Sequence, residues 1–390
     1  ILAASILNKQ TTIKNIPYVN DILTMLNLLK FIGLKYKLSK KKNSVEVTNL
    51  DKKINTVAPY KLVKTMRAGV LVLGPLLARY GNAKVSLPGG CAIGTRPVDL
   101  HLFALKKLGA KIKIKNGYIL ASAPKGLKGA SFRFPSISVG ATENVILAAI
   151  KAKGVTVIEN CAVEPEIKDL INFIKKLGVK IKIKGRKITI SGSIKEKKIT
   201  HKIICDRIEL GTYLIGGALT AKKLSLKNVD PKLVKSEILI LKKMGVKMNI
   251  GKNYIEIYKS NNIKKINIKT APYPGFPTDL QAQIMILMTQ AEGVSKIKEN
   301  IFENRFMHVP ELKRMGAKIE IRNNIASISG PCFLTGAEVM ATDLRASVSL
   351  VLAALIADKR TKINRIYHLD RGYQDLEKKL IKCKAVIKRI

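Results

Sequence analysis

The chain has 390 residues, 47% of them hydrophobic, and a formal net charge of +44. This length exceeds that of one ordinary core and predicts two domains, and the apolar fraction is typical of globular rather than disordered proteins. The five cysteines include no Cys-x-x-Cys pair, which argues against zinc and for a reducing compartment. We therefore expect a two-domain cytoplasmic protein that binds no metal.

The large positive charge first suggests binding to nucleic acid or to a membrane surface. The lysines are not gathered in one tail, however, and in segments such as 111–115 and 180–184 they alternate with isoleucine. Such alternation places lysine on the exposed face of half-buried strands. The apolar run 68–78 is also shorter than the roughly 20 residues of a membrane span. We predict neither a nucleic-acid nor a membrane partner, and a field that favours small acidic substrates.

Six similar segments follow one another along the chain. Each predicts an apolar helix, a short strand, a second helix that ends in Leu-Lys-Lys-hydrophobic-Gly or a variant of it, and an alternating strand. Glycine after the last turn predicts a helix stop in the left-handed conformation. The marker positions are 67 to 76 residues apart, and the sixth copy is degraded to lysine: Gly33, Gly109, Gly178, Gly245, Gly316 and Lys384.

The apolar helices are predicted at 1–9, 63–81, 139–154, 210–223, 278–293 and 342–360, and the strands after them include 12–15, 155–160, 223–228, 294–300 and 362–365. Repeats of this length are too long for a solenoid, so three per domain predict two similar globules. We expect an α/β fold with the apolar helices inside a ring of sheets. The boundary near 204–206 gives domains 1–204 and 205–390, the first of which carries the segment around Cys91.

Segment 87–101 reads Leu-Pro-Gly-Gly-Cys-Ala-Ile-Gly-Thr-Arg-Pro-Val-Asp-Leu-His. Glycines let such a loop approach a ligand closely, and a thiol near a guanidinium can act as proton donor or nucleophile. Cys91 has glycines and charged residues as neighbours, so we interpret it as functional. The remaining cysteines fit the alternative of an inert, buried side chain: Cys161, Cys205, Cys332 and Cys383.

Arginine binds phosphate and carboxylate groups through a planar fork of N–H donors. In a chain dominated by lysine, arginines at motif positions indicate that this geometry is needed. The candidates are Arg67, Arg96, Arg305, Arg345 and Arg371. The alternative, a surface ion pair, stays open and is strongest for Arg305.

Asp279 is the candidate base. Three prolines within 271–283 stiffen the approach to Thr278-Asp279, which opens an apolar helix. The alternative is a charge that only stabilises the helix N-terminus. Segment 138–142 opens another helix with Ser, Gly and Thr, a composition that suits an anion site. The histidines show no metal-ligand spacing, and we expect hydrogen-bonded structural residues at His101, His308 and His368.

Together these segments resemble the enolpyruvyl transferase family, and specifically the branch that acts on UDP-N-acetylglucosamine. The resemblance covers essentially the whole chain and rests on 64–68, 88–101, 138–142, 206–209, 271–283, 302–310, 342–346 and 367–373. The Cys91 segment is the most specific of these, because the branch acting on shikimate 3-phosphate lacks it. The resemblance implies an inside-out α/β barrel of two similar domains.

The resemblance implies transfer of the enolpyruvyl group of phosphoenolpyruvate to the 3-hydroxyl of UDP-N-acetylglucosamine, with phosphate release and no cofactor, as the first committed step of peptidoglycan synthesis. It implies Cys91 as proton donor and Asp279 as the residue that takes the hydroxyl proton. At phosphoenolpyruvate it implies Arg96, Arg345 and Arg371. Around the UDP-sugar it implies Arg67, Arg96, Pro97, Val98, Asp99, Leu100, Ser136, Ile137, Ser138, Val139, Asp279 and Ile301.

Two departures from the family pattern are visible. The family carries a Lys-Asn pair before its first helix, whereas this sequence starts at Ile1 without Met, so we expect an upstream segment to be missing. Ser136 stands at a position that is commonly basic. Two other functions stay open, an enolpyruvyl transferase with another acceptor such as shikimate 3-phosphate, and a basic binding protein without catalysis.

Overall fold

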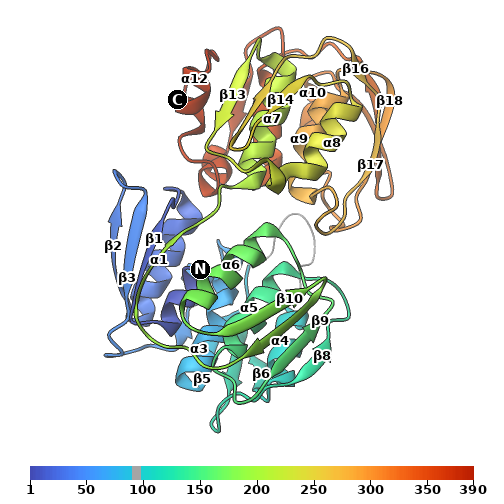
Figure 1. Ribbon diagram of the computed structural model, residues 1–390. Coiled ribbons are helices and arrows are strands. Elements are labelled where there is room, and N and C mark those ends of the chain that lie inside the picture. Colours follow the sequence, from blue (N-terminus) through green and yellow to red (C-terminus); the bar gives the residue numbers. More distant parts are fainter. Residues whose placement is uncertain (90–97) are drawn as a thin grey trace. The chain divides into compact units, whose positions relative to one another are not determined.

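The computed structural model describes residues 1–89 and 98–390 (Figure 1). The described residues form two compact units, unit 1 with residues 1–89 and 98–204 and unit 2 with residues 205–390. Each unit has its own hydrophobic core. Among the described residues, no helix is both long and apolar enough to cross a membrane.

Unit 1 repeats one arrangement three times: a buried helix, a strand, a second helix, a hairpin and a short strand. Its α-helices and 3₁₀ helices (η) are η1 (Ala3–Leu7), α1 (Asn20–Ile32), α2 (Tyr60–Val63), η2 (Arg67–Val72), α3 (Leu73–Tyr80), α4 (Asp99–Lys107), α5 (Val139–Ala149) and α6 (Pro165–Lys176). Its strands are β1 (Gln10–Lys14), β2 (Lys35–Ser39), β3 (Ser44–Thr48), β4 (Val57–Ala58), β5 (Asn82–Ser86), β6 (Lys111–Lys115), β7 (Tyr118–Ser122), β8 (Ser131–Arg133), β9 (Thr156–Glu159), β10 (Lys180–Lys184), β11 (Lys187–Ser191) and β12 (Lys198–Lys202).

The strands of unit 1 form three four-stranded sheets, β12-β1-β3-β2, β4-β5-β7-β6 and β8-β9-β11-β10. In each sheet a central strand pairs antiparallel with a hairpin, as Gln10 of β1 lies opposite Thr48 of β3. The short strand that ends one repeat runs parallel to the central strand of the next, and β12 returns to β1, where Lys198 lies opposite Gln10. The three repeats are therefore linked in a closed cycle of sheets.

Unit 2 follows the same order of elements with a shorter last repeat. Its helices are α7 (Arg207–Thr220), η3 (Pro231–Val234), α8 (Lys235–Lys243), η4 (Thr278–Leu280), α9 (Gln281–Met288), α10 (Val309–Arg314), α11 (Leu344–Ala354), η5 (Ile366–Arg371) and α12 (Leu376–Lys382). Its strands are β13 (Leu224–Lys227), β14 (Met248–Ile250), β15 (Tyr254–Ile257), β16 (Ile263–Lys264), β17 (Asn267–Lys269), β18 (Ala291–Lys298), β19 (Lys318–Arg322), β20 (Ile325–Gly330), β21 (Glu338–Met340) and β22 (Lys362–Asn364). The sheets are β13-β15-β14, β16-β18-β20-β19 with β17 also on β18, and β21-β22.

The apolar helices are buried, as the sequence predicts. Every residue of α9 and eight successive residues of α11, 346–353, are buried. Because these helices are apolar on nearly all sides, they can only pack inside the unit, and α9 contacts both α7 and α11. In Figure 1 the helices α3 and α5 lie between the sheets of unit 1. This arrangement brings the first turns of α7, α9 and α11 close together.

Several predicted boundaries are wrong: the helix predicted at 342–360 ends at Ala354, and that predicted at 1–9 is the 3₁₀ helix Ala3–Leu7. Segment 63–81 is not one helix but α2, η2 and α3, and Gly74 packs against Asn144 so closely that a Cβ there would lie 2.4 Å from the Asn144 carbonyl oxygen. Residues 291–293 belong to strand β18 rather than to the preceding helix. At 63–81 and at 291–293 tertiary pairing overrides the apolar helical pattern.

The marker glycines confirm the predicted helix stops. Gly33, Gly109, Gly178, Gly245 and Gly316 have φ values of 118, 89, 88, 86 and 93°, all in the left-handed region. Lys384, at the sixth marker position, adopts a φ of 67° as well. Its amide donates to Ile381, as that of Gly316 donates to Lys313. The degraded repeat therefore keeps the backbone of the other five with a side chain that disfavours it.

We expect Lys384→Gly to raise the free energy of unfolding by about 0.5–1 kcal/mol, because glycine adopts positive φ without the Cβ clash. The matched control is the reverse change, Gly109→Lys, at a position where a Cβ meets nothing within 4 Å. That variant should lose a similar amount. Urea unfolding of both variants and of the wild-type protein measures these free energies. If Lys384→Gly is less stable than the wild type, the backbone of Lys384 is not strained.

Candidate functional site

Three of the predicted site residues, Cys91, Arg96 and Pro97, lie outside the described residues. The others lie on both units. On unit 1 the predicted UDP-sugar residues lie on three segments, which are the start of η2 with Arg67, the start of α4 with Val98, Asp99 and Leu100, and the start of α5 with Ser136, Ile137, Ser138 and Val139.

His101 and Asn144 join these three segments. His101, on α4, is 4% exposed, and its Nδ1 lies 3.1 Å from Nδ2 of Asn144 on α5. Asn144 Nδ2 also donates to the carbonyl of Val70 in η2 at 3.2 Å, and its Oδ1 accepts the Gly74 amide at 2.7 Å. Because Asn144 donates, His101 Nδ1 accepts and the ring proton sits on Nε2. His101 is thus the hydrogen-bonded structural histidine that the sequence predicts.

The surroundings of His101 keep it neutral. Burial first, and the charge of Arg67 second, lower its pKa from 6.5 to about 4. A Cβ at Gly140, in the first turn of α5, would lie 3.1 Å from the His101 ring. The ring therefore lies beside both Arg67 and the N-terminus of α5, where two of the predicted UDP-sugar segments begin.

We expect the stability of the protein to fall when the pH drops from 7 to 5. The pKa of His101 is about 4 in the folded protein and 6.5 in the unfolded chain. Between these two pH values the unfolded chain therefore binds a proton at His101 that the folded protein does not bind. Linkage then makes unfolding easier by roughly 2 kcal/mol at pH 5 relative to pH 7. Urea unfolding at both pH values, with the wild-type chain and His101→Gln, measures this. Equal losses in the two proteins would rule out His101 as a source.

The start of α5 has the features of an N-terminal cap. Ser138 accepts the backbone N–H of Ala141 at 3.3 Å, while Ser136 and Val139 are exposed and Ile137 is half-buried. The Ser138 hydroxyl oxygen makes the cap. Ser136 precedes the helix, and its side chain is exposed. The N–H groups of this turn and the positive end of the helix dipole favour an anion.

On unit 2 three aspartates stand at equivalent places, and only one of them does not cap its helix. Asp206 accepts the backbone N–H of Ile208 at 2.8 Å at the start of α7. Asp343 accepts that of Arg345 at 2.7 Å at the start of α11. Asp279, in the first turn of η4, has Pro277 as the capping residue, and no side chain caps that helix. Asp279 is therefore a first-turn acidic residue, as the alternative of a helix N-terminal charge expects, but it does not cap the helix.

The Asp279 carboxylate faces two arginines instead. Its Oδ1 accepts from Nη2 of Arg305 at 2.8 Å, and its Oδ2 lies 3.8 Å from Nε of Arg345. The Arg305 side chain is only 5% exposed, so the alternative of a surface ion pair is wrong for this residue. Asp279 is 41% exposed and thus reachable for a substrate hydroxyl.

The Arg345 guanidinium is largely buried and only partly paired among the described residues. Its side chain is 16% exposed, and its Nε and Nη1 have no hydrogen-bond partner within the described part of the chain. Burial acts to lower its pKa, but Tyr373, Asp206 and Asp279 together raise it above the ordinary value. A buried guanidinium with such donors, beside a carboxylate, is suited to bind an anionic ligand.

Glu299 is a site residue that sequence reasoning missed. Its carboxylate is 2% exposed and accepts hydrogen bonds from Thr278 Oγ1 at 2.9 Å and from the backbone N–H of Ile301 at 2.8 Å. Thr278 precedes Asp279, and Ile301 is a predicted UDP-sugar residue. Glu299 therefore fixes these two segments relative to each other. The only signal in the sequence is an acidic residue at the end of an apolar strand.

Arg371 lies at the end of η5, and its charge helps to lower the pKa of His368, for which burial is the first cause. Neither ring nitrogen of His368 has a hydrogen-bond partner within residues 1–89 and 98–390, so the expected hydrogen-bonded histidine is wrong there. The ring nitrogens of His308 likewise have no hydrogen-bond partner within the described residues, so the expectation is wrong there too, and burial lowers its pKa to about 4. Across the same residues no group of three or more His, Cys, Asp or Glu side chains could hold a metal.

The remaining cysteines differ in exposure. Cys161 and Cys332 are buried, as expected, and burial raises the pKa of the Cys161 thiol to about 12. Cys205 is half-buried, and burial raises its pKa too. Cys383, in contrast, is exposed, because it follows α12 in the shortened sixth repeat, so the prediction of a buried side chain is wrong there.

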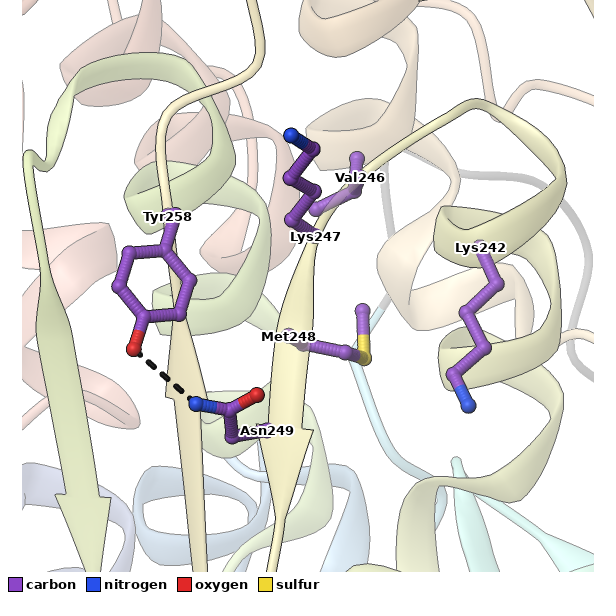
Figure 2. A pocket seen from close by; sticks show the side chains of 6 residues that line it. All are labelled: Lys242, Val246, Lys247, Met248, Asn249 and Tyr258. Carbon is purple, nitrogen blue, oxygen red and sulfur yellow. Dashed lines mark hydrogen bonds between the residues drawn. The ribbon is translucent and has the colours of Figure 1, made fainter.

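A separate hollow of about 560 Å³ lies on unit 2 between α8 and the strands β14 and β15 (Figure 2). Met248 points from β14 toward α8, and Asn249 donates to the Tyr258 hydroxyl at 3.2 Å. Two lysines, Lys242 and Lys247, line it as well. None of the candidate site residues contributes to this hollow, so it does not extend the site around Asp279.

Comparisons with known proteins give the family. The family model described as EPSP synthase (3-phosphoshikimate 1-carboxyvinyltransferase) matches residues 1–380. Three relatives are each named UDP-N-acetylglucosamine 1-carboxyvinyltransferase. The one from Pelagibacter ubique is 59% identical, with 100% of this chain and 93% of the relative covered. Those from Nitratiruptor and Rickettsia akari are 50% identical, with 100% of this chain and 93% and 94% of the relatives covered.

Solved structures show the same α/β fold. The enolpyruvyl transferase NikO from Streptomyces tendae matches with a TM-score of 0.89 at 23% identity, covering 99% of this chain and 92% of that chain. EPSP synthase from Acinetobacter baumannii matches with a TM-score of 0.72 at 19% identity, covering 95% and 90%. From the family match and the identity of its relatives, the chain belongs to the EPSP synthase family of enolpyruvyl transferases.

Proposed function

We propose that this protein transfers the enolpyruvyl group of phosphoenolpyruvate to the 3-hydroxyl of UDP-N-acetylglucosamine and releases phosphate, the first committed step of peptidoglycan synthesis. The observation that carries the proposal is the 59% identity over the whole chain to a relative with this named activity. The carboxylate of Asp279 beside the partly unpaired Arg345 supports it, since the reaction needs a base and an anion site together.

In this proposal Arg96, Arg345 and Arg371 bind phosphoenolpyruvate. Asp279 takes the proton of the attacking hydroxyl, while the Cys91 thiol donates a proton to the methylene carbon of phosphoenolpyruvate. The hydroxyl oxygen bonds to C2 of phosphoenolpyruvate in this addition. Phosphate then leaves C2 with its bonding electrons while one methyl proton returns to the Cys91 thiolate, which restores the double bond on the transferred group. The UDP-sugar contacts Arg67, Arg96 to Leu100, Ser136 to Val139, Asp279 and Ile301.

The finer architecture belongs to the same proposal. Residues 1–204 and 205–390 are the two domains, each an inside-out α/β barrel. Support comes from the closed cycle of sheets in unit 1 and the buried helices of both units. Because its substrates would be a nucleotide sugar and a small phosphorylated acid, we place the protein in the cytoplasm, without a nucleic-acid partner.

The test is phosphate release from phosphoenolpyruvate by this chain, with UDP-N-acetylglucosamine, with shikimate 3-phosphate, and with neither. Release that depends on the UDP-sugar supports the proposal. If release depends on shikimate 3-phosphate instead, the protein is an enolpyruvyl transferase with that acceptor. If the folded protein releases no phosphate and instead is retained on DNA in a salt-sensitive manner, the basic binding protein is the better description.

A further inference from the structure

Arg345 lies against a group of buried polar side chains that the proposed reaction does not use. Thr212 on α7 and Tyr373 after η5 are each 2% exposed, and Gln283 on α9 is fully buried. Thr212 Oγ1 lies 3.1 Å from the Tyr373 hydroxyl and 3.3 Å from Gln283 Nε2. Gln283 Nε2 also donates to the backbone carbonyl of Asp279 at 3.0 Å. The group therefore connects Arg345 and Asp279, two of the candidate site residues of unit 2.

The hydrogen bonds of this group have a fixed direction. Thr212 has one hydroxyl proton, and it donates that proton to the backbone carbonyl of Ile208 at 2.8 Å. The Thr212 oxygen must therefore accept from Tyr373, whose only hydroxyl proton is used in this way. The lone pairs of the Tyr373 oxygen remain for a donor on its other side.

That donor is Arg345. A hydrogen bond from Arg345 to Tyr373 contributes to the raised pKa of the guanidinium, and Arg345 Cζ lies 5.7 Å from the centre of the Tyr373 ring. Nε and Nη1 have no hydrogen-bond partner within the described residues. The hydrogen bonds are thus donated in one direction, from Arg345 through Tyr373 and Thr212 to the backbone of α7.

We propose that Tyr373 is a positioning residue that holds the Arg345 guanidinium so that Nη1 faces phosphoenolpyruvate while Nε stays beside Asp279. This inference rests on the proposed function. A long side chain with a buried charge would otherwise be free to turn toward Asp206, whose charge also acts on it. Small displacements of a binding group are costly in rate, so a fixed acceptor at this place matters.

Tyr373→Phe tests the inference because it keeps the ring and removes only the hydroxyl. We expect the KM for phosphoenolpyruvate to rise about tenfold, with kcat changed less than about threefold, since Arg345 contacts the substrate in the ground and transition states alike. The KM for UDP-N-acetylglucosamine should not change. Thr212→Val should act in the same direction, and the double variant should add little, because both changes break one chain.

Tyr213→Phe is the matched control. Tyr213 follows Thr212 on α7, and its hydroxyl is also buried but has no hydrogen-bond partner within the described chain. Its removal should leave both KM values at the wild-type level. If Tyr373→Phe and Tyr213→Phe have equal effects, or if Tyr373→Phe lowers only the melting temperature, Tyr373 is merely structural and the inference is overturned.

A spectrum of the protein with ¹⁵N-labelled arginine reads the position of Arg345 without any turnover. The Nε–Hε signal of Arg345, assigned with Arg345→Lys, should move in Tyr373→Phe and Thr212→Val and stay in place in Tyr213→Phe. An unmoved signal overturns the inference. If the wild-type chain releases no phosphate with the UDP-sugar, the proposed function fails, whereas this spectrum still decides the role of Tyr373.

Discussion

Replacing Asp279 by Asn should lower kcat for phosphate release by about 10²–10⁴-fold, the usual contribution of a positioned general base. The amide has nearly the same shape and can still accept from Arg305 through its carbonyl oxygen, but it cannot take the proton of the attacking hydroxyl. Because Asp279 does not cap its helix, the fold should tolerate the change. Initial rates of phosphate release, with binding of the UDP-sugar measured by calorimetry, test this.

Asp230→Asn is the control for the loss of one negative charge on unit 2. Asp230 caps η3 by accepting the Lys232 amide at 3.0 Å, and asparagine caps helices equally well. This variant should keep the wild-type rate. If Asp279→Asn weakens only the affinity for the UDP-sugar while kcat stays unchanged, Asp279 is a binding residue and not the base.

The repeat could be predicted from the sequence because its signal is local. A glycine after the last apolar residue of an amphipathic helix is a strong stop signal, and the five marker glycines all adopt positive φ. Lys384, at the sixth marker position, has the same backbone conformation although lysine does not favour it. Helix ends set by the chain itself are therefore visible before the structure is known.

The polar contacts of the buried helices could not be predicted, because their partners lie one repeat away. Asn144 accepts from Gly74 over 70 residues, and Gln283 donates to Thr212 over 71 residues. These separations match the repeat length, so each contact joins equivalent helices of successive repeats. In the sequence, Asn144 and Gln283 are each a single polar residue inside an apolar run, and no local pattern predicts the residue that they contact.

The same limit applies to Asp279. Thr278-Asp279-Leu280 and Thr342-Asp343-Leu344 are identical in sequence. Asp343 accepts two backbone N–H groups of its own helix, whereas Asp279 accepts from Arg305, which lies 26 residues further along the chain. Sequence context alone assigns both aspartates to helix starts, and the difference between a cap and a candidate base appears only with the neighbouring arginine in place.

Replacing Cys91 by Ser should lower the rate of phosphate release by at least about 10²-fold and leave the fold intact, if Cys91 is the proton donor. An ordinary thiol with a pKa near 8.5 is mostly protonated at pH 7 and still gives up its proton readily, whereas a serine hydroxyl is a far weaker acid. Removal of the acid raises the barrier to protonation of the methylene carbon.

The matched control for Cys91→Ser is Cys383→Ser, because Cys383 is exposed and lies on unit 2 after α12. It should retain the wild-type rate, and both variants should unfold at the wild-type temperature. Unchanged phosphate release in Cys91→Ser would remove Cys91 from the chemistry, and Asp279 would then be the only candidate left among the proposed proton-transfer groups. A large loss in Cys91→Ser with no loss in Cys383→Ser assigns the acid to the glycine-flanked thiol, as the Gly89-Gly90-Cys91 sequence predicts.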